Sequence, residues 1–508
     1  MKILFYQLLN FYMVIMFWNC CKIRLTSCHE DLNFIIEGPG LNPLNIVMPA
    51  RYFYIYIDNK HNGNFSYSYD MKQKVDVKIS GKTITNRECR TWVNILDRND
   101  GSFIVRYKLF ESCFNFIINV LYNKKHIAQS PYKIEEMIQT DDCDCPNYDF
   151  HKWFNNYGCK DTYFQINSDL NRFPTVDYNK LQIFTSQKFN NSSSMSVCNY
   201  VIYKNEIFRK CYGQHVGFKM FMDAILLSLT RKVRLPDLEM YVNLGDWPLV
   251  KLNDKIQLPM FSWCGSTETS DIVLPTYDIT ESSLECMGRV SLDMLSVQGN
   301  IKLPWNKRTP KAFWRGRDSN RYRLNLVDIA KKNPDLFNVS LTNFFFFRDE
   351  EHKYGPKEKH VSFFDFFEYK YQINMDGTVA AYRFPYLLAG GSLVFKQESV
   401  YYEHFYSNLK PWQHYIPFKM DLSDLVDKLQ WALRNDEKAY QIAQNGRKFA
   451  EDYLLPHDVF CYHSLLFKEW SKHIVNKVKV REGMEKVIQV SNNACICETK
   501  KSRFKEEL

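Results

Sequence analysis

The chain has 508 residues, which is enough for two to four domains with full-sized cores. Its hydrophobic content of 45% and aromatic content of 16% exclude an intrinsically disordered protein. The net charge of +9 is small for this length, and lysine and arginine form no long block. The charge therefore excludes a nucleic-acid footprint and indicates a modest bias toward anionic ligands.

The N-terminal segment 1–21 predicts a secretory signal peptide. One lysine precedes an apolar run that Gln7 and Asn10 interrupt. A membrane span needs about 20 apolar residues with few polar ones, so a signal peptide fits better than an anchor. An uncleaved anchor remains an open alternative, and no later segment is long and apolar enough to span a membrane.

Residues 29–136 predict an all-β unit, an immunoglobulin-like β-sandwich. Short runs with alternating apolar residues, such as 51–57 and 75–79, are separated by turns rich in Gly, Asn and Asp. Four segments in this unit resemble a filamin-type repeat, in the same order: 38–41, 49–53, 97–107 and 126–134. Such repeats bind partners, often by adding a strand at a sheet edge.

The fifteen cysteines indicate disulfides in an oxidising compartment. Their spacing matches no zinc site, and two pairs are separated by one residue, at 143–145 and 495–497. The pairing stays open at this point. If Cys20 and Cys21 leave with a signal peptide, an odd number remains, and at least one cysteine is free or pairs between chains.

From about residue 140 to 495 the pattern alternates between strands and helices. Residues 238–245 predict a buried strand, and Asp421 is a candidate N-cap for a helix with apolar residues at helical spacing. Two more amphipathic helices are predicted over 437–453 and 457–473. This alternation predicts an α/β domain of two Rossmann-like halves with a cleft between them.

Asp246 is the first candidate functional residue. It follows the predicted strand as Gly245-Asp246-Trp247-Pro248. Open α/β sheets place working side chains at the carboxyl ends of their strands. A turn-initiating aspartate before proline is the competing structural interpretation.

Two arginines flank a glycine at the end of a second apolar strand. Arg315, Arg317 and the nearby Ser319 belong to the segment Phe313-Trp-Arg-Gly-Arg-Asp-Ser319. A pair of guanidinium groups in this arrangement fits a diphosphate, because each can donate two parallel hydrogen bonds to phosphate oxygens. A solvated charged turn is the structural alternative.

The segment 371–395 predicts a strand, a turn, a helix and a second strand that together form a phosphate pocket. Gly377 lets backbone amides approach an anion, and Thr378 is a candidate helix N-cap. Arg383 would then lie in the first turns of the helix, which Pro385 ends or bends. Gly390 and Gly391 stop the helix.

The chain terminates in residues 505–508, Lys-Glu-Glu-Leu, a variant of the KDEL-type retrieval tetrapeptide. Together with a signal peptide, it predicts the lumen of the endoplasmic reticulum and a retrieval receptor as a partner. Glu506 replaces the aspartate of KDEL and keeps the charge.

These clusters resemble the CAP10-type glycosyltransferases, the family of protein O-glucosyltransferases, and most of all its members with a KDEL motif. Those members combine a signal, a filamin-like repeat, the transferase domain and a retrieval tail, in the order seen here. Further matching runs are 261–280, 284–294 and 401–417.

The resemblance implies a GT-B-like, metal-independent, inverting transferase without a cofactor. It would move glucose or xylose from a UDP-sugar to a serine of an EGF-like repeat, with Asp246 as the general base. Trp247, Trp263 and Trp305 are candidate walls of the sugar or acceptor site, and a packing role in the core is the structural alternative for each. The donor-binding residues that the resemblance implies are Arg315, Arg317, Ser319, Gly377, Thr378, Val379, Ala380, Ala381, Tyr382, Arg383 and, for the ribose, Glu403.

Two other functions remain open from the sequence. A metal-using GT-A transferase would need an Asp-x-Asp pair, and Asp142-Cys143-Asp144 has those letters within the cysteine-rich junction. A non-catalytic binding protein of the endoplasmic reticulum would use only the filamin-like repeat, to recruit client proteins.

Overall fold

The computed structural model describes residues 32–45, 50–58, 74–190, 194–284 and 293–488, together with Cys495 and Cys497. The predicted signal peptide and the predicted retrieval tail lie outside these ranges. Within them, no helix is both long enough and apolar enough to cross a membrane.

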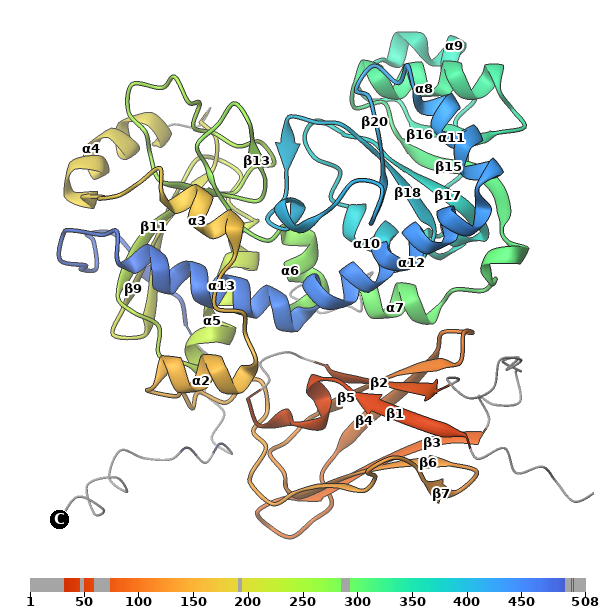
Figure 1. The fold of residues 1–508 in the computed structure, drawn as a ribbon. Helices are drawn as coiled ribbons and strands as arrows, with labels where there is room; N and C mark the ends of the chain where they lie inside the picture. Colours follow the sequence, from red (N-terminus) through yellow and green to blue (C-terminus); the bar gives the residue numbers. More distant parts are fainter. Residues whose placement is uncertain are drawn as a thin grey trace, which may run out of the picture.

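The N-terminal unit is a sandwich of two antiparallel sheets, as predicted, and lies below the rest of the molecule in Figure 1. Alternate residues of β2, such as Phe53 and Ile55, are fully buried between the sheets. The disulfide Cys89–Cys113 closes the same core. One sheet has the order β1 (Asn33–Glu37), β2 (Arg51–Asp58), β5 (Ser102–Leu109), β4 (Thr91–Asp97); the other contains β3 (Val75–Lys82), β6 (Phe114–Tyr122), β7 (Lys125–His126) and β8 (Tyr132–Ile134).

The first half of the α/β region contains a mixed six-stranded sheet. Its order is β14 (Ile272–Val273), β12 (Met260–Ser262), β11 (Leu238–Asn243), β9 (Val197–Tyr203), β10 (Glu206–Tyr212), β21 (Glu485–Lys486). Only β14, β12 and β11 are parallel, so this half is not the parallel sheet that a Rossmann-like unit would have. The reason is local: Lys204 and Asn205 form a two-residue turn with positive φ at both positions, which joins β9 and β10 as a hairpin.

Helices surround this sheet. They are α2 (Phe150–Tyr157), α3 (Phe164–Leu170), α4 (Tyr178–Phe189), α5 (Lys219–Lys232) and α6 (Tyr277–Leu284). The next helix, α7 (Met294–Gly299), packs instead against α10 (Phe384–Ala389) of the second half and against β4 and β5 of the β-sandwich. The predicted strand over 238–245 is confirmed as β11, in which every residue is buried.

The second half contains a five-stranded sheet in which all strands are parallel. Its order is β16 (Phe337–Asn343), β15 (Thr309–Arg317), β17 (Tyr369–Asn374), β18 (Leu393–Gln397), β20 (Ile416–Phe418). Its helices are α8 (Arg321–Lys332), α9 (Glu351–Tyr354), α10 (Phe384–Ala389), α11 (Leu425–Arg434) and α12 (Asp436–Tyr453). Asp421 does not cap α11, because that helix begins four residues later and the Asp421 carboxylate accepts from the Ser423 amide instead.

The two halves are tied together at several places. The chain returns to the first half through α13 (Pro456–Ser471), whose Trp470 Nε1 donates to the Glu239 carbonyl at 2.8 Å. The short strands β13 (Gly265–Ser266) and β19 (Tyr401–Tyr402) pair across the halves. The disulfides Cys143–Cys495, Cys145–Cys497 and Cys159–Cys461 join the junction and α2 region to the C-terminal part of the chain.

The β-sandwich is also fixed to the α/β region. Arg98 bonds Glu451 of α12 at 2.5 Å, and Arg447 bonds Asp100 at 2.9 Å. Three of these four side chains are less than a tenth exposed, and Asp100 is the more open one. Tyr52 and Tyr54 of β2, on the face opposite the sandwich core, pack in the same cluster as the α/β core. The sandwich is therefore part of one packed body with the two halves.

Candidate active site

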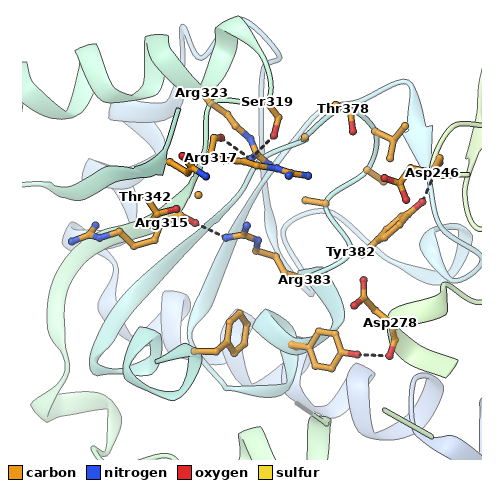
Figure 2. A pocket seen from close by; sticks show the side chains of 18 of the residues that line it. Asp246, Asp278, Arg315, Arg317, Ser319, Arg323, Thr342, Thr378, Tyr382 and Arg383 are labelled. Atoms are coloured by element: carbon orange, nitrogen blue, oxygen red, sulfur yellow. Dashed lines mark hydrogen bonds between the residues drawn. The ribbon is translucent and has the colours of Figure 1, made fainter. Parts of the chain in front are cut away.

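A cavity of about 590 Å³ lies between the two halves, at the carboxyl ends of β11, β15, β16 and β17. Two carboxylates and four arginines of the described chain line it, and Figure 2 shows the arginines clustered on one side with Asp246 and Asp278 on the other. This is the edge at which open α/β sheets bind ligands. The four arginines that line the cavity are Arg315, Arg317, Arg323 and Arg383.

The loop after β11 holds Asp246 in the cavity. The buried Asn243 side chain accepts from the Gly245 amide at 2.9 Å and donates to the Trp247 carbonyl at 2.6 Å, on either side of Asp246. The Tyr277 hydroxyl donates to Asp246 Oδ1 at 3.1 Å. One carboxylate oxygen is therefore oriented by the protein, and Oδ2 has no bond to a described residue, which suits a group that accepts a proton from a substrate.

Arg315 and Arg383 form a connected pair. The Arg315 guanidinium donates to Asn338 Oδ1 at 2.7 Å and to the Asn338 carbonyl at 2.9 Å, so β16 fixes its position. Arg383 Nη1 donates to the Arg315 carbonyl at 2.6 Å. Burial lowers the pKa of both guanidinium groups from their usual value, which indicates a site that gains from a bound anion.

Arg323 is a cavity residue that the sequence analysis missed. It lies in the first turn of α8 and donates to three backbone carbonyls, those of Asp376, Arg317 and Met375, at 2.7 to 3.1 Å. Its side chain is only 4% exposed, and burial, followed by the charge of Arg383, lowers its pKa to about 9. Arg323 thus ties the ends of β15 and β17 together and adds positive charge behind them.

The segment 376–383 is a loop and not the start of a helix. α10 begins at Phe384, so Thr378 is not an N-cap, and the predicted helix N-terminus near Gly377 is wrong. Pro385 lies in the first turn of α10 and starts the helix rather than ending it. The prediction that Gly390 stops the helix is confirmed.

The loop still brings its backbone close to the arginines. A Cβ atom at Gly377 would lie 3.3 Å from Arg323 Nη2, which is tighter than ordinary contact. The Gly377 amide itself donates to the Val379 carbonyl at 2.8 Å. The cavity wall includes every residue from 377 to 383, so all seven predicted positions in this run do line the site, as do Ser319 and Asp246.

Glu403 does not line this cavity. It is fully buried, its Oε1 accepts from the Tyr406 hydroxyl at 3.2 Å, and burial raises its pKa to about 8. It therefore belongs to the core behind the cleft and not to a ribose site. Likewise, Trp247, Trp263 and Trp305 are absent from the wall: the first is exposed, the second is fully buried, and the third packs at a tilt against the ring of Tyr440.

The Asp142-x-Asp144 pair also lies away from the cavity. The cysteine between the two aspartates and the one that follows them are bonded to Cys495 and Cys497, which places the pair in a cross-linked junction. Among the described residues, no three His, Cys, Asp or Glu side chains form a group that could hold a metal ion.

Comparison with known proteins gives two family matches. The description Glycosyl transferase family 90 matches residues 155–508, and Filamin/ABP280 repeat matches residues 32–133. Protein O-glucosyltransferase 2 of Danio rerio is 50% identical over 475 residues, which cover 93% of this chain and 94% of that protein. Protein O-glucosyltransferase 3 of Homo sapiens is 44% identical over 481 residues, with 93% and 94% covered.

A third relative matches only part of the chain. Protein O-glucosyltransferase 1 of Homo sapiens is 34% identical over 301 residues, which cover 57% of this chain and 76% of that protein. The family match spans more than half of the chain and contains the whole cavity between the two halves. The chain therefore belongs to glycosyl transferase family 90, as the sequence motifs indicated, and carries a filamin repeat before the transferase domain.

Proposed function

We propose that this protein is a protein O-glucosyltransferase that moves glucose from UDP-glucose to a serine hydroxyl of an EGF-like repeat. The observation that carries the proposal is one cavity with Asp246 on one side and four guanidinium groups on the other. A transferase that releases a nucleoside diphosphate needs both: a base for the acceptor hydroxyl and positive charge for the leaving group. The printed names of the relatives support glucosyl transfer to protein.

The proposed reaction is a single displacement. Asp246 removes the proton of the serine hydroxyl while its oxygen forms a bond to the anomeric carbon. The bond from that carbon to the β-phosphate oxygen breaks on the opposite face, and UDP leaves with the electron pair. The products are UDP, the protonated Asp246 and a glucosylated serine with inverted configuration.

The arginines take the role of charge stabilisation in this scheme. Arg383, Arg315 and Arg317 neutralise the diphosphate as negative charge develops, and free amides of the 377–383 loop assist them. Arg323 holds the ends of β15 and β17 in place behind them. With this charge supplied by protein, the proposed step needs no metal ion, and a GT-B-like arrangement of two halves with one cleft accommodates both substrates.

We assign the protein to the lumen of the endoplasmic reticulum. Within the described residues, ten cysteines form five disulfides, which is typical of an oxidising compartment. The filamin repeat, which the buried Arg98–Glu451 pair and the partly exposed Arg447–Asp100 pair hold against the transferase domain, would contribute to the recognition of acceptor proteins.

Incubation of a folded EGF-like repeat with the protein and an equimolar mixture of UDP-glucose and UDP-xylose tests the proposal. Mass spectrometry should detect one added hexose on a serine, with and without EDTA. No added sugar from either donor would contradict the function, and loss of transfer with EDTA would contradict the metal-free step. Addition of a pentose alone would replace glucose by xylose as the donor sugar.

A further inference from the structure

Asp278 is a second carboxylate in the cavity, and the reaction proposed above gives it no role. It lies in the first turn of α6, where the Thr276 hydroxyl caps the helix by accepting from the Ile279 amide. Its backbone carbonyl accepts from the Tyr386 hydroxyl at 3.0 Å, which fixes this turn against α10. Its side chain points into the cavity in Figure 2.

The carboxylate of Asp278 has no protein partner in the described parts of the chain. No hydrogen bond or ion pair reaches its oxygens, in contrast with Asp246, which accepts from Tyr277. A half-buried carboxylate without donors costs free energy, and closing the cavity around a substrate would increase that cost. A bound ligand that supplies hydrogen-bond donors would remove it.

The position of Asp278 restricts which part of a substrate can supply those donors. Its charge interacts with Asp246 and with Arg383, and in Figure 2 it lies on the Asp246 side of the cavity, across from the arginines. In a single displacement the sugar occupies the space between the base and the diphosphate site, because the nucleophile and the leaving group are on opposite faces of the anomeric carbon. Asp278 is part of the cavity wall that borders this space. The diphosphate itself is anionic and would be repelled by a carboxylate.

We propose that Asp278 is a specificity-determining residue, whose carboxylate accepts hydrogen bonds from hydroxyl groups of the donor sugar. The inference rests on the proposed function and deepens it by assigning the sugar subsite. Hydroxyl groups are the only strong donors of a neutral hexose or pentose, and a carboxylate accepts two of them at once. Burial, then the nearby Asp246 charge, raises the pKa of Asp278 to about 6, so the carboxylate is ionised at neutral pH.

The test compares three ligands by titration calorimetry at pH 7.5: UDP, UDP-glucose and UDP-xylose. Asp278→Asn should bind UDP as the unaltered protein does, within two-fold. It should bind UDP-glucose about ten-fold or more weakly, because a charged hydrogen bond is replaced by a neutral one. An equal loss for UDP-xylose would assign the contact to hydroxyls that both sugars have; a loss for UDP-glucose alone would assign it to the hydroxymethyl group.

Two further variants make the result decisive. Arg321→Ala changes an exposed residue outside the cavity, which pairs with Glu350, and should leave all three affinities unchanged. Asp278→Ser should reproduce the selective loss, with UDP affinity as the measure of an intact fold. Unchanged binding of both UDP-sugars in the Asp278 variants would overturn the inference, and so would an equal loss for UDP itself. Failure of the unaltered protein to bind UDP or UDP-glucose would instead overturn the proposed donor, and this inference with it.

Discussion

Replacement of Arg383 tests the diphosphate site most sharply. One of its nitrogens, Nη1, is engaged by the Arg315 carbonyl at 2.6 Å, and the remaining donors of the guanidinium border the cavity. A hydrogen bond to a charged group contributes about 1.5–3 kcal/mol. Arg383→Ala should therefore weaken UDP binding by about 10- to 150-fold, since 1.4 kcal/mol corresponds to about ten-fold in affinity. Titration calorimetry with UDP measures this directly.

Two further variants serve as controls: one keeps the charge at position 383, and the other removes an arginine outside the cavity. Arg383→Lys keeps the charge but loses the planar fork, so its affinity should lie between those of the alanine variant and the unaltered protein. Arg321→Ala removes an exposed arginine of α8 that pairs with Glu350 at 2.7 Å and does not line the cavity. It should leave UDP binding unchanged. UDP binding by Arg383→Ala at the unaltered affinity, or a similar loss in Arg321→Ala, would refute the assignment of Arg383.

Two predictions concern stability. Arg481→Gln should lower the free energy of unfolding by about 3–5 kcal/mol in urea denaturation, because it leaves the fully buried Glu239 without its ion pair at 2.8 Å. Lys472→Gln, which breaks an exposed ion pair, should change the free energy of unfolding by less than about 1 kcal/mol. Equal effects of the two variants would contradict this reasoning. Burial and the charge of Asp246 raise the pKa of Asp278 in the folded state to about 6, Arg383 opposes this shift, and Glu281 adds to it. Between about pH 4 and 6 the folded state therefore binds more protons than the unfolded state, and the protein loses stability as the pH rises through that window. Asp278→Asn should therefore stabilise the protein more at pH 7 than at pH 4, and an equal effect at both pH values would show that Asp278 carries no such cost.

The spacing of buried residues within strands and helices could be predicted from the sequence, whereas the direction of the strands could not. Alternation in β3 and helical spacing in α11 and α12 reflect burial on one face, which the residues record directly. The antiparallel hairpin of β9 and β10 was missed because an apolar run is the same in either direction. Lys204-Asn205 is not one of the usual hairpin dipeptides, although asparagine tolerates positive φ.

The candidate site was predicted where it depends on strand ends and was missed where it depends on tertiary contacts. Asp246 follows β11, and Arg315 and Arg317 are at the carboxyl end of β15, so their sequence context placed them at one sheet edge. Arg323 is a helix residue that shares a face with Val327 and Ala330, both buried. A single arginine in such an apolar stripe is a signal that could have found it, because a buried charge requires partners.

Asp278 had no comparable signal, since an acidic residue in the first turn of a helix is ordinary on electrostatic grounds alone. Only the packing of α6 beside the second half brings it into the cavity with Asp246 and Arg383. The incorrect prediction that Thr378 caps a helix has a different cause. Proline is favoured in the first turn of a helix, and Pro385 marks the start of α10 six residues beyond Gly377–Thr378.

The measurement that tests the central claim most directly is sugar transfer by the Asp246→Asn variant. A folded EGF-like repeat and UDP-glucose are incubated with the variant or the unaltered protein, and the glucosylated repeat is quantified by mass spectrometry, with UDP affinity measured in parallel. The account predicts a rate about 10²- to 10⁴-fold lower at unchanged UDP affinity, because the general base is lost while the arginine side of the cavity is intact. Transfer at the unaltered rate would show that Asp246 is not the base and would contradict the account.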